Sequence, residues 1–126
     1  MLWKNILLVA LGGSLGSVAR FLCQKYIYAW HPHPFPFGTF IVNVVGCFLI
    51  GIFYAWAEKG QLLTPEWRIL LTTGFCGGFT TFSSFAFENI SLLKNGEISY
   101  FLLYCAGSVV IGIAACWAGI ILIKQT

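Results

Sequence analysis

The chain contains very little charge. Only 9% of its 126 residues are Asp, Glu, Lys or Arg, whereas 59% are hydrophobic. A water-soluble domain needs charged side chains on all of its faces, so this composition excludes that class and predicts an integral membrane protein. The seven Lys and Arg residues are also too few and too scattered to form a nucleic-acid-binding patch.

Residue sets that carry out catalysis or hold a soft metal ion are missing as well. No paired nucleophile and base can be recognised, so the sequence does not predict an enzyme. His31 and His33 lie in a proline-rich loop without a thiol or carboxylate cluster, which favours a solvated loop over a metal site. The cysteines form no CxxC motif and are expected to be small packing residues within apolar segments. They are Cys23, Cys47, Cys76, Cys105 and Cys116.

Four apolar segments are each long enough to cross a membrane. They cover residues 2–28, 39–57, 69–93 and 98–123, and the connections between them are too short for a second domain. Residues 39–57 hold no charge and correspond to about 29 Å of helix, which matches the hydrocarbon thickness of a bilayer. We therefore expect an all-α, multi-pass protein of the cell inner (plasma) membrane with a single membrane domain over residues 1–126.

The first segment also resembles a secretory signal sequence, with Lys4 before an apolar run and small residues at 17–19. Gly12 and Gly13 interrupt the run, and apolar residues resume beyond Arg20. A first membrane span that carries a buried arginine accounts for more of these residues than a cleaved signal does.

The Lys and Arg residues give only a weak signal for orientation. If the N-terminus, residues 58–68 and the C-terminus share one side, that side carries Lys4, Lys59, Arg68 and Lys124, against Lys25 and Lys94 on the other. A bias of four against two fits one orientation with a faint signal. It fits equally a protein that inserts both ways, with opposite copies pairing.

The third span contains a segment that a simple anchor would lack. Residues 74–87 read G-F-C-G-G-F-T-T-F-S-S-F-A-F, with glycines, hydroxyls and phenylalanines at helical spacing. Every backbone group freed by a break in a membrane helix needs a partner, so we expect a helix broken near its middle for a functional reason. Phe82 and Phe85 share one helix face, and Thr81 and Ser84 lie on an adjoining stripe.

Few other polar side chains lie at membrane depth. Arg20 either attracts an anion or snorkels to the interface, and snorkelling is favoured for it. Asn43 either forms an interhelical hydrogen bond or binds an ion, and the hydrogen bond is favoured when Asn43 is taken alone. In the fourth span Tyr104, Ser108 and Gly112 recur every four residues and form a polar strip. A donor-rich path without lysine suits a small anion that must bind and then leave.

The size of the chain argues for assembly. Four helices pack into a bundle whose axis is filled by side chains, so an ion path would more easily use the surfaces of two copies. Small residues four apart, as in Gly12/Gly16 and Gly74/Gly78, predict close packing of helices. This spacing supports packing in general and does not specify a dimer.

Three ordered motifs give the chain a specific resemblance. They are G-G-S-L-G-S-V-A-R-F at residues 12–21, G-T-F-I-V-N-V-V-G at 38–46 and T-T-G-F-C-G-G-F-T-T-F-S-S-F at 72–85. With the four spans, they resemble the Fluc (CrcB) family of fluoride channels over essentially the full length. The resemblance implies an antiparallel, dual-topology homodimer that exports cytoplasmic fluoride passively through two pores.

The resemblance also implies residue roles. Asn43 would donate its amide to fluoride, Phe82 and Phe85 would present their ring edges, and Ser108 with Tyr104 would belong to a polar track. The whole ion pathway expected from the residues and the resemblance comprises Arg20, Asn43, Thr81, Phe82, Ser84, Phe85, Glu88, Tyr104 and Ser108.

Three further positions follow from the same resemblance. The main-chain carbonyls of Gly77 and Thr80 would hold a structural sodium ion at the centre of the dimer, and a helix break frees such carbonyls. Glu88 resembles a carboxylate at the mouth of the pathway. Gly112 departs from the pattern, because relatives can carry a hydroxyl there.

Two other functions stay open on the sequence alone. A small dual-topology proton-coupled exporter needs a carboxylate at membrane depth, yet only the third span contains one, Glu88, toward its end. Flux that is independent of a proton gradient would exclude it. A structural membrane subunit would tolerate loss of the pattern over residues 80–85.

Overall fold

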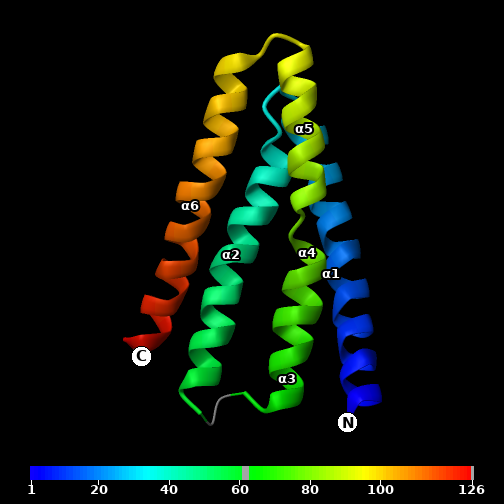
Figure 1. The fold of residues 1–126 in the computed structure, drawn as a ribbon, viewed down its shortest axis with the longest axis vertical. Helices are drawn as coiled ribbons and strands as arrows, with labels where there is room; N and C mark the ends of the chain where they lie inside the picture. Colours follow the sequence, from blue (N-terminus) through cyan, green and yellow to red (C-terminus); the bar gives the residue numbers. More distant parts are fainter. Residues whose placement is uncertain (61–62, 126) are drawn as a thin grey trace.

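The computed structural model describes residues 1–60 and 63–125, and their regular elements are helices (Figure 1). In chain order these are α1 (Leu2–Trp30), α2 (Phe37–Glu58), α3 (Pro65–Ile69), the π-helix η1 (Leu70–Cys76), α4 (Gly77–Phe79), α5 (Phe82–Lys94) and α6 (Ile98–Lys124). Elements α3 to α5 follow one another along a single span. The described residues thus contain four helical segments long and apolar enough to cross a membrane, which confirms the predicted all-α membrane fold.

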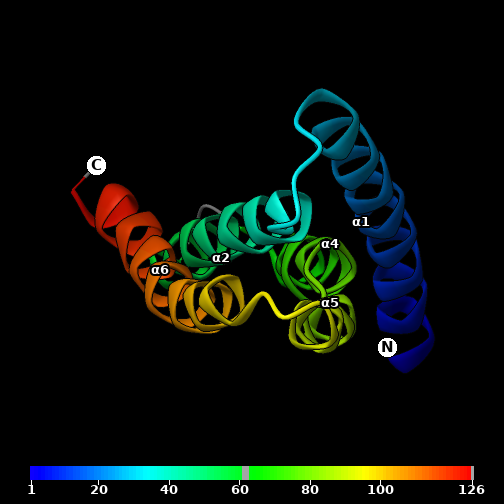
Figure 2. The ribbon, with the colours of Figure 1, turned by 90° about the horizontal axis from the view of Figure 1, so that it is seen from above.

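The spans form a curved row rather than a closed bundle (Figure 2). Helix α6 packs along α2, while α1 packs against η1 and α4. Among the described residues α1 and α6 make no contact, and they lie at opposite ends of the row. The expected common axis filled by four helices is therefore absent, because α1 covers the third span instead of closing against α6.

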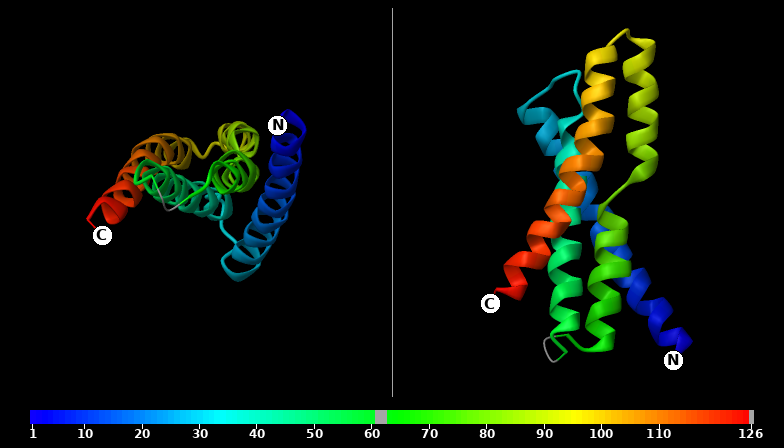
Figure 3. Two further views of the ribbon diagram at one scale, coloured as in Figure 1. Left: turned by 90° about the horizontal axis from the view of Figure 1, so that it is seen from below. Right: turned by 60° about the vertical axis from the view of Figure 1, so that its left-hand side comes forward.

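The third span is broken at two threonines. Thr80 and Thr81 have extended backbones, with φ −84° and ψ 158° for Thr80 and φ −150° and ψ 122° for Thr81. The Thr81 hydroxyl accepts a hydrogen bond from the Ser84 amide at 3.2 Å, so Thr81 is the N-cap of α5. The right-hand view of Figure 3 shows the extended step between the two helical halves. The predicted break near the middle of the third helix is confirmed.

The break transfers the third span from one neighbour to another. Before it, α3, η1 and α4 all contact α1, whereas α5 contacts α6 and α2. A straight helix would stay beside one partner along its length. The step at Thr80 and Thr81 therefore moves the span from α1, which lies beside its first half, to α6, which lies beside its second half. Helix α2 contacts both halves.

Glycines let α1 approach the third span until the two main chains touch. A methyl group added at Gly16 would collide with the carbonyl of Phe75, and one added at Gly78 would lie 3.0 Å from the Cα atom of Gly13. Gly12 and Gly74 are similarly close to the opposite backbone. The predicted small-residue pairs thus serve packing within one chain.

We expect Gly16→Ala to lower stability by about 1–3 kcal/mol, because the added methyl meets backbone atoms that cannot rotate away. The measurement is the temperature at which half of the purified protein leaves its size-exclusion peak. Gly13→Ala is the matched control, since a methyl group added at Gly13 would have the Gly74 carbonyl oxygen, 3.9 Å away, as its nearest neighbour. Equal losses in the two variants would contradict the packing explanation.

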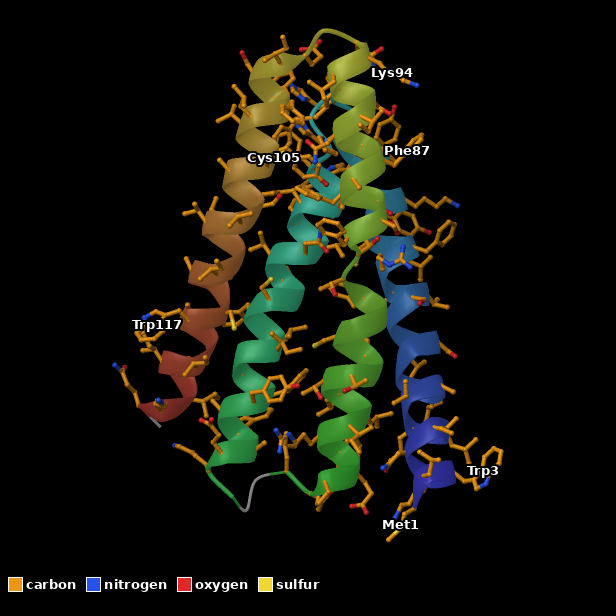
Figure 4. The ribbon with its side chains drawn as sticks, in the orientation of Figure 1. Met1, Trp3, Phe87, Lys94, Cys105 and Trp117 are labelled. Carbon is orange, nitrogen blue, oxygen red and sulfur yellow. The ribbon has the colours of Figure 1, made fainter. Side chains whose placement is uncertain are left out.

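The start of α1, the end of α2, the start of α3 and the end of α6 lie at the same end of the spans, at the bottom of Figure 1. An ion pair of 3.1 Å between the Lys4 ammonium and the Glu66 carboxylate ties the start of α1 to this end. Lys4, Lys59, Arg68 and Lys124 therefore share one side of the protein, as the predicted bias of four against two requires. Large aromatic side chains such as Trp3, Phe87 and Trp117 point outward, where lipid surrounds the protein (Figure 4).

Candidate functional site

Asn43 of α2 holds the break of the third span. Its side-chain NH2 donates to the Thr81 carbonyl at 3.1 Å, and its oxygen accepts from the Thr81 amide at 2.8 Å. This two-way pair satisfies the backbone of a residue that has left the helix. The interhelical hydrogen bond considered for Asn43 is therefore present. An amide nitrogen carries two hydrogens, so one donor of Asn43 remains for another acceptor.

An open cavity of about 570 Å³ adjoins the break. It lies between α2, the third span and α6, and its polar wall is formed around the break. Five of the predicted pathway residues line it, namely Asn43, Thr81, Phe82, Phe85 and Ser108. Gly77 and Thr80, the predicted sodium ligands, line the same cavity.

The hydroxyl of Ser108 lacks a partner in this cavity. Its oxygen is buried, and it has no hydrogen-bond partner among the residues that the structure describes. A buried polar atom without a partner is costly, so the Ser108 hydroxyl is a donor free to take up a water molecule or a ligand. One turn further along α6, a side chain at Gly112 would meet the Cys47 sulfur at 3.4 Å. A small side chain at this position would thus fit with a slight shift of Cys47, and nothing among the described residues requires glycine there.

Aromatic rings continue the wall of the cavity in a series. The ring centroids of Phe82 and Phe85 are 5.7 Å apart, and those of Phe85 and Tyr104 are 4.8 Å apart. Phe82 is 78% exposed, whereas Tyr104 is fully buried. The series thus runs from the open side of the chain into its interior.

Glu88 is the centre of a partly buried hydrogen-bond chain. The hydroxyls of Thr39 and Tyr104 each donate to one of its carboxylate oxygens at 2.7 Å, and the Gln24 amide donates to the Thr39 oxygen at 2.9 Å. The chain joins α1, α2, α5 and α6. Gln24 and Thr39 are not among the predicted pathway residues, although polar side chains in apolar segments were the available signal.

A second cavity of about 400 Å³ lies on the other side of Glu88. Gln24, Ser84, His31 and residues 33–37 line it, so Ser84 faces a different space from Phe82 and Ser108. His33 packs edge-on against Tyr100 and accepts a hydrogen bond from the Phe35 amide at 3.0 Å. The histidines are thus part of a folded aromatic loop. Nowhere in residues 1–60 and 63–125 do three His, Cys, Asp or Glu side chains gather as a metal cluster.

Arg20 of α1 is turned toward the third span. Its Nε atom donates to the Gly78 carbonyl at 3.1 Å, in a partly buried setting. The amide four residues after Gly78 belongs to Phe82, which lies beyond the break. Arg20 therefore supplies a donor to a carbonyl at the end of α4.

The break also frees the two predicted sodium ligands. In a continuous helix the Gly77 carbonyl would accept from the Thr81 amide, and the Thr80 carbonyl from the Ser84 amide. Here the Thr81 amide is bonded to Asn43 and the Ser84 amide to the Thr81 hydroxyl. Both carbonyls thus lose the partner that a helix would give them. Main-chain oxygens at an unwound helix are the donors that suit a sodium ion, so these residues fit the predicted site.

Comparisons with known proteins agree with this architecture. A family model described as "CrcB-like protein, Camphor Resistance (CrcB)" matches residues 7–120. A relative from Flavobacterium psychrophilum is 44% identical over 97% of this chain and 98% of its own length. Relatives from Leptospira interrogans and Chlorobium luteolum are 45% and 50% identical, over 97% and 95% of this chain and 96% and 92% of their own lengths. All three are named "Fluoride-specific ion channel FluC".

Proposed function

The chain belongs to the CrcB family, and on this premise we propose that it is a fluoride-specific ion channel that lets cytoplasmic fluoride leave passively down its gradient. Its four spans make it a multi-pass membrane protein, and the plasma membrane is where such a channel acts on cytoplasmic fluoride. One observation carries the proposal: neutral donors and aromatic rings line one cavity at the break of the third span. Because the relatives are named as ion channels, we propose no enzymatic activity.

The chemistry of the cavity supports a small anion. Asn43 has a remaining N–H donor, the Ser108 hydroxyl is unpartnered among the described residues, and Phe82 and Phe85 stand beside them. The edges of aromatic rings carry partial positive charge. Fluoride gives up its water only where close donors replace it, and a larger anion fits a narrow donor set poorly. No Lys is among the described residues that line the cavity, which lets the anion leave again.

We further propose that two copies assemble antiparallel and form two pores. Phe82 is 78% exposed although it lines the cavity, and the cavity is open toward the outside of the row. A second copy would cover both. The four-to-two bias of Lys and Arg between the two ends is small enough to permit insertion in both orientations.

The test is anion efflux from liposomes that contain only this protein, with fluoride and chloride compared at zero pH gradient. We expect fluoride efflux and no measurable chloride efflux. Flux that requires a proton gradient would support a proton-coupled exporter instead, and no flux of either ion would support a structural subunit. Equal rates for fluoride and chloride would contradict the channel proposed here.

A structural sodium ion is the proposed partner of the Gly77 and Thr80 carbonyls. When bound, it would supply a positive charge between the broken helices of two copies. Replacement of sodium by the bulky cation N-methylglucamine is therefore expected to lower the dimer fraction in detergent, measured by cross-linking. At about 100 times its Kd, a bound ion stabilises an assembly by about 2.7 kcal/mol. A dimer fraction that is independent of sodium would exclude this role.

A further inference from the structure

Two buried hydroxyls converge on one charged group within the membrane. Thr39 is 2% exposed and Tyr104 is fully buried, and both donate to Glu88 at 2.7 Å. Short O–H bonds to a carboxylate are about twice as strong as bonds between neutral groups. Thr39 and Tyr104 thus form an anion-binding donor pair, and the anion that now occupies it is a side chain of the protein.

The direction of the Thr39 hydroxyl is fixed by a third residue. The Gln24 amide donates to the Thr39 oxygen at 2.9 Å, so the single hydrogen of this hydroxyl is left to point at Glu88. The Thr39 hydroxyl of the donor pair is therefore oriented by a residue of α1, and not by α5.

The donor pair adjoins both cavities. The ring of Tyr104 is 4.8 Å from the ring of Phe85, which lines the 570 Å³ cavity beside Asn43 and Ser108. Glu88 and Thr39 line the 400 Å³ cavity on the other side. The donor pair therefore has one cavity on each side, and the second cavity gives the carboxylate space to move into.

We propose that the Glu88 carboxylate is an internal competitor that holds the hydroxyls of Thr39 and Tyr104 until a permeating fluoride ion displaces it. The inference rests on the proposed channel function. Conduction requires sites that bind an ion well enough for entry and weakly enough for release. A carboxylate that returns to the same donors expels the ion, so Glu88 sets the affinity at this point.

The first test is Glu88→Gln in the liposome assay, with efflux measured over a series of internal fluoride concentrations. A neutral amide competes poorly and does not repel the ion, so the concentration that gives half-maximal flux should fall at least about tenfold. Glu58→Gln is the matched control, since Glu58 is exposed at the end of α2 opposite Thr39. An unchanged or raised half-maximal concentration in Glu88→Gln would overturn the proposal.

Two further variants separate occupation of the donors from the charge itself. Glu88→Asp keeps the charge on a shorter side chain that cannot reach both hydroxyls, so its half-maximal concentration should also fall. If Glu88→Gln no longer elutes at the size-exclusion position of the wild type, Glu88→Asp replaces it in the test. In a Tyr104→Phe background, Glu88→Gln should have a much smaller effect than in the wild type, because one of the shared donors is gone. An undiminished effect there would mean that the charge acts directly.

Absence of fluoride efflux in the wild type would instead refute the channel function, independently of the variants.

Discussion

Asn43→Ala is expected to reduce fluoride efflux at least about 100-fold. The variant loses an N–H donor at the cavity, and removal of one preorganised donor to an oxyanion in an enzyme costs about 10²–10³ in rate, which we take as the scale here. It also loses both hydrogen bonds to Thr81, which leaves the amide and the carbonyl of a broken membrane helix without partners. The measurement is efflux from liposomes at matched protein content.

The two effects of Asn43→Ala are separated by Asn43→Asp. The aspartate can still accept from the Thr81 amide, but an ionised carboxylate has no hydrogen to donate. We expect it to lose a similar share of the flux although it keeps one of the two bonds to Thr81, because its other oxygen has no hydrogen to give to the Thr81 carbonyl or to an anion. Asn5→Ala, an exposed position on the first turn of α1, is the control. Wild-type flux in Asn43→Asp would contradict the donor role of this amide.

The second large effect is expected for the rings that line the cavity. Phe82→Ala and Phe85→Ala should each lower fluoride efflux about two- to tenfold, because an aromatic contact of this kind is worth roughly 0.5–1.5 kcal/mol. Phe85 lies between Phe82 and Tyr104, so its removal also leaves Tyr104 without a ring neighbour on that side. The readout is again efflux, with the size-exclusion profile recorded for each variant.

Phe87→Ala is the matched control for the two ring variants. It is the same change two residues after Phe85 in α5, at a ring that is 72% exposed and points away from the other helices (Figure 4). We expect its flux to stay near that of the wild type. If all three variants lose flux equally, the rings act through general stability and not as a lining of the ion path.

The spans and the break could be predicted from the sequence because both depend on local composition. Hydropathy determines which segments enter a membrane, and glycines followed by threonines and serines at residues 74–84 indicate a helix that stops and restarts. The break lies where this pattern indicated, at Thr80 and Thr81. The assignment of roles to Asn43 and to the phenylalanines depended on the family resemblance.

The contacts that assemble the site could not be predicted in the same way. Asn43 and Thr81 are 38 residues apart, and Thr39 and Glu88 are 49 apart. Such pairs depend on the rotation and depth of each helix, which a single sequence does not encode locally. The carbonyl contact of Arg20 is a similar case, since the residue type fits anion attraction, snorkelling or a backbone bond equally well. The row of spans depends on which helix the glycines of α1 pack against. Residue spacing identifies these glycines but does not identify the helix that they contact.

The two carbonyls released by the break bear on how the proposed dimer would assemble. Neither the Gly77 oxygen nor the Thr80 oxygen has the amide partner that a continuous helix would supply, and in hydrocarbon each unmatched group costs several kcal/mol. The proposed second copy and its sodium ion would complete these contacts. The main chain itself would then contribute to the free energy of association.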